Sequence, residues 1–133
     1  MELSKAGIVE KSWGYENIIV SNLLYCNKKL VFNEKYGSTS MHFHRHKTET
    51  FFAERGSFLI RIIDLDDTSI KEYKLDFRDS NNKNNLTLKP FVFHQIIAME
   101  DNSILVEVST ADYIVDSYRV YRTSKEDLKK ELT

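Results

Sequence analysis

Apolar and polar residues alternate with a period of two along most of this 133-residue chain, in short runs separated by turn-forming residues. This period places successive side chains on opposite faces of a β-strand, so each run predicts a short strand. The predicted strands span residues 18–25, 28–34, 40–46, 49–55, 57–64, 70–77, 86–88, 92–98, 104–109 and 114–122. Because no helical periods separate these runs, the pattern favours an all-β sandwich or barrel over a parallel α/β sheet.

The two ends of the chain depart from this pattern. Residues 1–11 are weakly patterned and predict an arm, or a strand that adds to a sheet in a dimer. Residues 124–132 predict a short helix, with Ser124 as its N-cap and Asp127 at the capping-box position. From its length, we expect the whole chain, residues 1–133, to form a single domain.

Two connections can also be predicted from composition. Asn27 and Lys28 suggest a tight hairpin between the first two predicted strands. Residues 78–85, which read RDSNNKNN, form the most polar piece of the chain and predict an exposed loop.

The charge balance narrows the choice of partners. Lys plus Arg is 19 and Asp plus Glu is 20, so the net charge is 19 − 20 = −1. This balance argues against nucleic acid or an anionic membrane as a partner. The single cysteine, Cys26, rules out an intramolecular disulfide, and the amino terminus does not resemble a signal peptide, so we expect a cytoplasmic protein.

Candidate chemistry gathers in residues 37–56, which contain three of the four histidines. His42, His44 and His46 fall on one face of a predicted strand, and Glu49 begins the next strand. Imidazole nitrogens and a carboxylate oxygen suit a divalent ion such as Zn, Fe, Mn, Ni or Co, and His94 would add a third nitrogen. The alternative is that this histidine run is only an exposed polar face.

The spacing of these residues resembles the cupin family. The first cupin motif is a glycine, HxH, a glutamate and a second glycine, and Gly37, His42, His44, Glu49 and Gly56 stand in that order. Residues 90–94, which read PFVFH, are similar to the second motif, one residue short and without its glycine.

The resemblance implies a cupin double-stranded β-helix, or jelly-roll barrel. It also implies that His42, His44, Glu49 and His94 are the metal ligands. From the residues alone, His46 is either a ligand in place of one of the others, a neighbour of the site outside the ligand set, or solvated at the end of its strand.

A second resemblance concerns sugar-related cupins. Residues 11–16, KSWGYE, look like the KPWGYE opening of cupins related to type II mannose-6-phosphate isomerases. Residues 104–110, ILVEVST, followed by Asp116 and Arg119, look like the end of the same cupins. This resemblance implies a carbohydrate as the small-molecule substrate. The Q-x-H-x-x-R pattern of the isomerases is replaced here by HxH.

The first functional hypothesis is a sugar or sugar-phosphate isomerase or epimerase. A divalent ion would polarise the substrate carbonyl while a base moves a proton between carbons. The candidate catalytic residues are Glu107 and His46. Glu107 alternates with Val106 and Val108, so it is either turned into the barrel or a solvated surface carboxylate.

Two other functions fit the same residues. An Fe(II)-dependent dioxygenase could use the same three-histidine, one-glutamate set. A non-enzymatic module that binds or senses a carbohydrate needs no acid or base. Small cupins commonly associate through strands, so we also expect a homodimer, with residues 1–11 suited to strand exchange.

Overall fold

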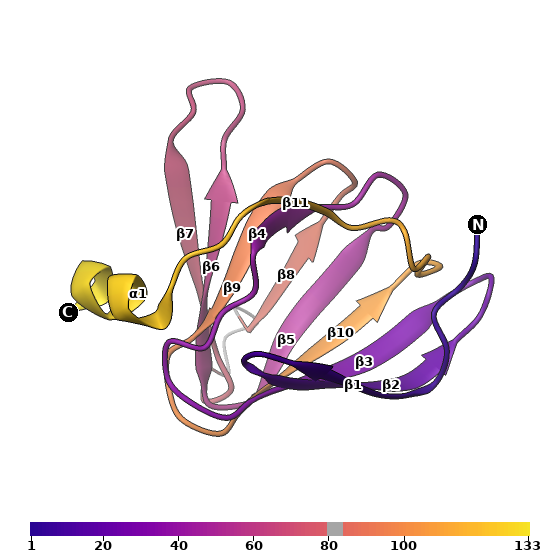
Figure 1. The fold of residues 1–133 in the computed structure, drawn as a ribbon, viewed down its shortest axis with the longest axis horizontal. Coiled ribbons are helices and arrows are strands. Elements are labelled where there is room, and N and C mark those ends of the chain that lie inside the picture. The colour runs from indigo at the N-terminus through magenta and orange to yellow at the C-terminus, as the bar shows by residue number, and fades with distance from the viewer. Residues whose placement is uncertain (80–83) are drawn as a thin grey trace.

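The computed structural model describes residues 1–79 and 84–133, which form strands in two antiparallel sheets and one short helix (Figure 1). The strands are β1 (Gly7–Lys11), β2 (Gly14–Ser21), β3 (Cys26–Phe32), β4 (Met41–Phe43), β5 (Glu49–Arg55), β6 (Ser57–Ile63), β7 (Ile70–Asp76), β8 (Asn85–Leu88), β9 (Phe93–Ala98), β10 (Ser103–Ser109) and β11 (Tyr118–Tyr121). The helix α1 spans Lys125–Leu132. The predicted all-β class with a short C-terminal helix is therefore confirmed.

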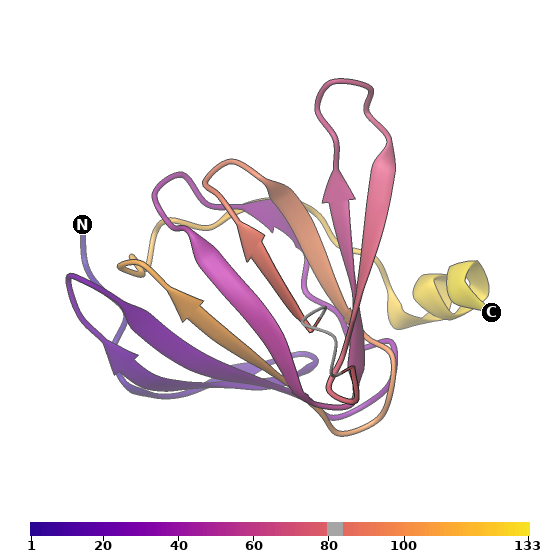
Figure 2. The same cartoon turned by 180° about the vertical axis from the view of Figure 1, so that it is seen from behind.

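The two sheets have the strand orders β1-β2-β3-β10-β5-β8 and β11-β4-β9-β6-β7. Neighbours in each sheet come from distant parts of the chain: β10 lies between β3 and β5, and β9 lies between β4 and β6. This order makes the chain wind back and forth between the sheets, as in a jelly roll. Figure 2 shows the same two sheets from behind, with the β6–β7 hairpin projecting beyond them.

The inner faces of the two sheets meet in one hydrophobic core. Phe32 from β3 stacks on Trp13, with ring centroids 4.1 Å apart, and meets Phe58 from β6 edge to face at 5.3 Å. Each fully buried aromatic ring of this kind contributes about 1.5–3 kcal/mol through the apolar surface it removes from water. The core therefore holds the two sheets together beside the histidine stretch.

Strand β5 follows the predicted alternation closely. Glu49, Phe51 and Ala53 are buried, while Phe52 and Glu54 are exposed. One strand thus supplies both core side chains and a carboxylate that points inward. The turn after it requires a glycine: Gly56 has φ of 76°, and a Cβ there would lie 2.1 Å from Ser103 Oγ.

The predicted strand 40–46 proves shorter, because β4 ends at Phe43. The carboxylate of Asp116 accepts hydrogen bonds from the backbone N–H groups of Arg45 (2.8 Å) and His46 (3.1 Å). These bonds turn the chain after His44, so His46 no longer shares a strand face with His42. The alternation in the sequence could not reveal this turn, because the residue that causes it lies far along the chain.

Three other predictions of local structure need correction. The first hairpin turn lies at residues 22–25 and not at Asn27 and Lys28. In this turn the Asn22 side chain accepts hydrogen bonds from the backbone N–H groups of Leu24 and Tyr25. Within residues 1–11, Gly7–Lys11 forms β1 and pairs with β2 of the same chain. The predicted run 114–122 is a strand only over Tyr118–Tyr121. Of the predicted loop 78–85, residues 80–83 lie outside the described residues.

Helix α1 begins as predicted. The Ser124 side chain accepts a hydrogen bond from the Asp127 backbone N–H at 3.1 Å, which satisfies one of the free donors of the first turn. Leu128 is fully buried against Tyr36 and Ile97, whose neighbours Ile96 and Ala98 face the core, so the helix packs on the outer face of the five-stranded sheet. In the described part of the chain, no helix is long and apolar enough to span a bilayer.

Candidate metal centre

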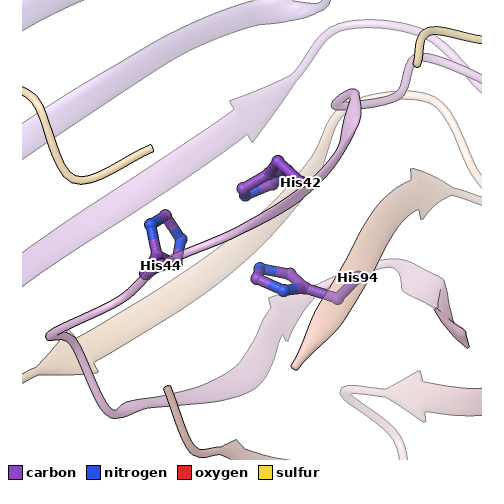
Figure 3. A group of neighbouring side chains, drawn as sticks. All are labelled: His42, His44 and His94. Carbon is purple, nitrogen blue, oxygen red and sulfur yellow. The ribbon is translucent and has the colours of Figure 1, made fainter. Parts of the chain in front are cut away.

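Three histidines, from β4, from the residue that follows it and from β9, point toward one another (Figure 3). His42 lies on β4 and His44 directly follows it, while His94 lies on β9 opposite His42 in the strand register. The side chains of residues that pair across strands project from the same face of the sheet. Each of the three offers a ring nitrogen within 4.8 Å of the other two.

The backbone fixes how each ring presents itself. His42 Nδ1 lies 2.7 Å from the carbonyl oxygen of Ser40, and His94 Nδ1 lies 2.9 Å from the carbonyl oxygen of Val92. In His44, Nδ1 lies 2.7 Å from the Asp116 carbonyl oxygen. A carbonyl oxygen can only accept, so each Nδ1 carries a proton and, in the neutral ring, Nε2 keeps its lone pair. This is the tautomer that a metal-ligating histidine needs.

Burial keeps two of these rings neutral. It lowers the pKa of His42 to about 3, and the neighbouring His94 and His44 add to the effect. Burial also lowers the pKa of His44 to about 4, with Lys47 as the largest charge effect. Both imidazoles are therefore unprotonated near neutral pH, as ligation of a cation requires.

Glu49 brings a carboxylate to the same place. It is only 2% exposed, and its Oε1 lies 2.8 Å from His94 Nε2 and 3.5 Å from His44 Nε2. Burial alone would raise the pKa of Glu49, but Lys47 and His94 outweigh it and hold that pKa well below its ordinary value. The carboxylate is therefore ionised.

The donor set fits a divalent cation. Both carboxylate oxygens of Glu49 and the Nε2 of His94 are buried and make no well-directed hydrogen bond, although Oε1 lies 2.8 Å from Nε2 and Oε2 lies 3.3 Å from Lys47 Nζ. Buried polar atoms are rarely left unsatisfied, and a cation would satisfy all three. Three imidazole nitrogens and one carboxylate oxygen suit a borderline divalent metal, so the three histidines can hold a metal ion.

A buried lysine stands behind the carboxylate. Lys47, 4% exposed, has its Nζ 3.3 Å from Glu49 Oε2, and it donates to Glu107 Oε2 at 3.0 Å and to Asp112 Oδ1 at 2.9 Å. The Asp112 carboxylate also pairs with Lys28 Nζ at 2.9 Å. Burial opposes the charge on Lys47, but these carboxylates raise its pKa well above the ordinary value.

Glu107 is turned inward, which decides between the two predicted orientations. It is 5% exposed, and Leu105 on the same face is fully buried, while Val108 is 42% exposed. Burial raises the pKa of Glu107, and Lys47 offsets this only in part. Lys47 thus lies between the carboxylates of Glu107 and Glu49.

His46 occupies a different environment. Its side chain is exposed, does not line the cavity, and lies edge to face with the Tyr113 ring at 6.2 Å. The structure therefore does not bring His46 together with the other histidines.

Sequence reasoning did not place Lys47, Lys28 or Asp112 at the site, and it assigned Lys28 only to a hairpin turn. Lys47 shares the parity of Glu49, but a lysine two residues before a strand carries no signal of burial. Asp116 was noted only through a family resemblance, and it both turns the chain after His44 and orients the His44 ring.

A cavity of about 540 Å³ opens from this centre. The three convergent histidines, Glu49 and Glu107 are among its polar lining residues. Trp13, Leu30 and Phe51 are among its apolar lining residues. Such a volume and such a mixed lining suit a small polar molecule. The arrangement can hold a cation and a substrate side by side.

Comparison with known proteins places this geometry in a fold family. No protein-family model matches the sequence, and no curated protein sequence does. Among solved structures, the capsular polysaccharide assembling protein CapF from Staphylococcus aureus is similar at 15% identity and a TM-score of 0.72, over 88% of this chain and 34% of CapF.

Two further structures are similar to this chain. PAC13 from Streptomyces, solved with uridine, matches at 11% identity and a TM-score of 0.70, over 91% of this chain and 89% of PAC13. A variant of oxalate decarboxylase OxdC from Bacillus subtilis matches at 12% identity and a TM-score of 0.68, over 90% of this chain and 32% of OxdC. The chain thus spans about a third of CapF and OxdC.

These neighbours are cupins, and the chain has the cupin fold that its motifs imply. At such low identities the likeness establishes the fold alone. The chain thus combines the cupin fold with a histidine cluster that could hold a metal ion.

Proposed function

We propose that this protein is a metal-dependent cupin enzyme that acts on a sugar or sugar phosphate, as an isomerase or epimerase. The observation that carries the proposal is the position of Glu107. This buried carboxylate with a raised pKa lines the same cavity as the histidines and is joined to the ligand carboxylate of Glu49 through Lys47.

In this proposal His42, His44, Glu49 and His94 hold a divalent ion (Zn, Fe, Mn, Ni or Co). The bound ion would polarise the substrate carbonyl. The backbone carbonyls on the three Nδ1 atoms keep the rings oriented, and Lys47 holds the Glu49 carboxylate in place. The apolar wall of Trp13 and Phe51 excludes water from one side of the sugar.

Glu107 serves as the base. For an aldose–ketose exchange, its carboxylate takes the proton from the carbon beside the carbonyl and returns it to the carbonyl carbon, while the hydroxyl proton moves to the carbonyl oxygen. Nothing is oxidised overall, so no co-substrate is needed. The raised pKa of Glu107 suits this role, because a single carboxyl group that both takes up and returns a proton near neutral pH must exchange it readily.

The neighbours support a carbohydrate-related ligand. CapF is named for assembling capsular polysaccharide, and PAC13 was solved with uridine, which contains a ribose. We extend this to the present chain as a proposal only. His46 has no part in it, because its side chain lies outside the cavity.

The test is turnover by protein loaded in turn with each of the five metals. A panel of hexoses, pentoses and their phosphates in deuterated water would be followed by proton NMR, which detects both isomerisation and exchange of the transferred hydrogen. Turnover is expected with at least one metal and is expected to fall at least about 100-fold in Glu107→Gln, while the exposed-site control His46→Gln stays at the parent rate.

Other outcomes identify the alternatives. Oxygen uptake by the Fe(II)-loaded protein with a thiol or diketone would favour the dioxygenase. Thermal stabilisation by a sugar without turnover would favour a binding module. Either result, with no isomerisation or exchange by any metal form, contradicts the proposed isomerase.

A further inference from the structure

The charged side chains that line the cavity are mostly paired with one another. Six are cationic and five are carboxylates. Every lysine among them has a carboxylate partner in the same cavity: Lys5 with Glu2 at 3.7 Å, Lys11 with Glu16 at 4.0 Å, Lys28 with Asp112 at 2.9 Å and Lys47 with Glu107 at 3.0 Å. Lys28 and Lys47 are thus held in buried ion pairs, whereas the Lys5 pair is exposed to solvent and the Lys11 pair is long, so these two pairs are weak.

The two arginines of the cavity differ from the lysines. Within residues 1–79 and 84–133, neither Arg119 nor Arg122 has a carboxylate within ion-pairing distance, and both are exposed residues that line the cavity. Elsewhere Arg61 pairs with Glu72 and Glu131, and Arg78 pairs with Asp76. The two guanidinium groups therefore keep their full hydrogen-bonding capacity.

Strand register places Arg119 beside the metal centre. In the β11–β4 pair it lies directly opposite His42, and the preceding Tyr118 lies opposite Phe43. The Tyr118 and Phe43 rings stack at 5.1 Å on the outer face, so Arg119 and His42 share the inner face. The Cβ atoms of directly opposed residues are about 5 Å apart, which puts the Arg119 side chain within reach of a ligand at the histidines.

Arg122 extends the positive surface away from the centre. It lines the cavity and also a second hollow, which is bordered by Tyr36, Thr123 and Ser124. The two hollows share Trp13 and Arg122, so a ligand whose reacting end lies at the histidines can place its other end against the arginines.

We propose that Arg119 and Arg122 bind an anionic group of the substrate, so that the cavity takes a carbohydrate bearing a phosphate or a carboxylate. This inference rests on the proposed function. A guanidinium group donates two parallel hydrogen bonds to either anion, which gives both charge and orientation. The buried lysines are engaged in ion pairs, and the arginines have no such partner within residues 1–79 and 84–133, so the arginines are free to bind an anionic ligand.

The experiment is calorimetric titration of the metal-loaded protein with glucose, glucose 6-phosphate, glucuronate and inorganic phosphate. The matched variants are the double replacement Arg119→Gln with Arg122→Gln, and the control Arg55→Gln, which removes an exposed arginine at the end of β5 that does not line the cavity. Thermal unfolding of each variant checks that it is folded.

We expect at least one anionic sugar to bind at least about tenfold more tightly than glucose, and the double variant to lose that difference while Arg55→Gln keeps it. Raising the salt concentration should weaken the binding of the anionic sugar and leave the binding of glucose unchanged. Preference for glucose 6-phosphate or for glucuronate identifies the anion as phosphate or carboxylate.

The proposal is overturned if neither anionic sugar nor inorganic phosphate binds, or if the folded double variant binds them as tightly as the parent. This outcome is separate from failure of the isomerase. Arginine-dependent anion binding without turnover would contradict the proposed reaction only. Turnover of neutral sugars that the double variant leaves unchanged would contradict the arginine site only.

Discussion

His94 lies directly opposite His42 in the register of β4 and β9, so that one pair of neighbouring strands supplies two of the three convergent imidazoles. His94 is also one of the buried groups that make no well-directed hydrogen bond, at its Nε2. We therefore predict that His94→Ala lowers the affinity for zinc by at least about 100-fold, since loss of a ligand costs more than loss of a group that supports one.

The measurement is zinc titration against a competing chelator, together with elemental analysis of the purified protein. His46→Ala is the matched control, because that histidine belongs to the same sequence run but its side chain is exposed. Equal metal content in the two variants would show that His94 is not a ligand.

Lys47 is predicted to be essential for stability as well as for the position of Glu49. Replacement by Met leaves the carboxylates of Glu49, Glu107 and Asp112 without their shared cation. Removing one partner from a buried ionic cluster costs about 3–5 kcal/mol. The surface pair Lys29–Glu54 provides the control, because Lys29→Met should cost no more than about 1 kcal/mol.

Urea unfolding of the metal-free proteins, prepared with a chelator, measures the free energy of unfolding of the Lys47→Met and Lys29→Met variants. Adding Glu107→Gln to Lys47→Met should recover part of the lost stability, because it removes one of the unpaired charges. Equal stability of the Lys47→Met and Lys29→Met proteins would contradict the buried network.

Asp112 gives the network a defined pH dependence. Burial by itself raises the pKa of its carboxyl, but Lys47 and Lys28 outweigh this and hold the folded-state pKa below the ordinary value. The unfolded chain then binds the proton more tightly, so the contribution of Asp112 to stability is present above its unfolded pKa of about 3.9 and is lost as the pH falls below it.

The comparison is between the parent and Asp112→Asn, unfolded with urea from pH 7 to pH 2.5. The difference in their free energies of unfolding should stay constant down to about pH 5 and then shrink. A difference that grows as the pH falls would mean that the folded-state pKa of Asp112 is raised instead.

A homodimer remains a prediction. Strand β1 pairs with β2 of its own chain, which leaves its other edge at the end of the six-stranded sheet. Ile8 and Val9 on this edge are exposed, and an unpaired apolar edge strand favours association with another chain.

Light scattering at micromolar concentration should give twice the mass of one chain. Val9→Lys should shift the protein toward the monomer, and Leu65→Lys, at an exposed turn, should not. A monomer mass for the parent would refute the dimer.

The local period of the sequence determined the strands and much of the fold class. Alternation in residues 49–55 predicted which side chains face inward, because a strand has a strict two-residue period. The HxH spacing and the carboxylate at Glu49 indicated a metal centre for the same reason. Ser124 marked the start of the helix, because capping is a local interaction.

What the tertiary structure decided depends on residues far apart in the chain. Asp116 turns the backbone after His44 and removes His46 from the cluster. Lys47 is buried only because Glu107 and Asp112 meet it from another part of the chain. The sequence around Glu107 allowed either face of β10 to point inward, since both carry apolar residues. Packing of the two sheets selects one face, because the same strand cannot bury both faces against one core.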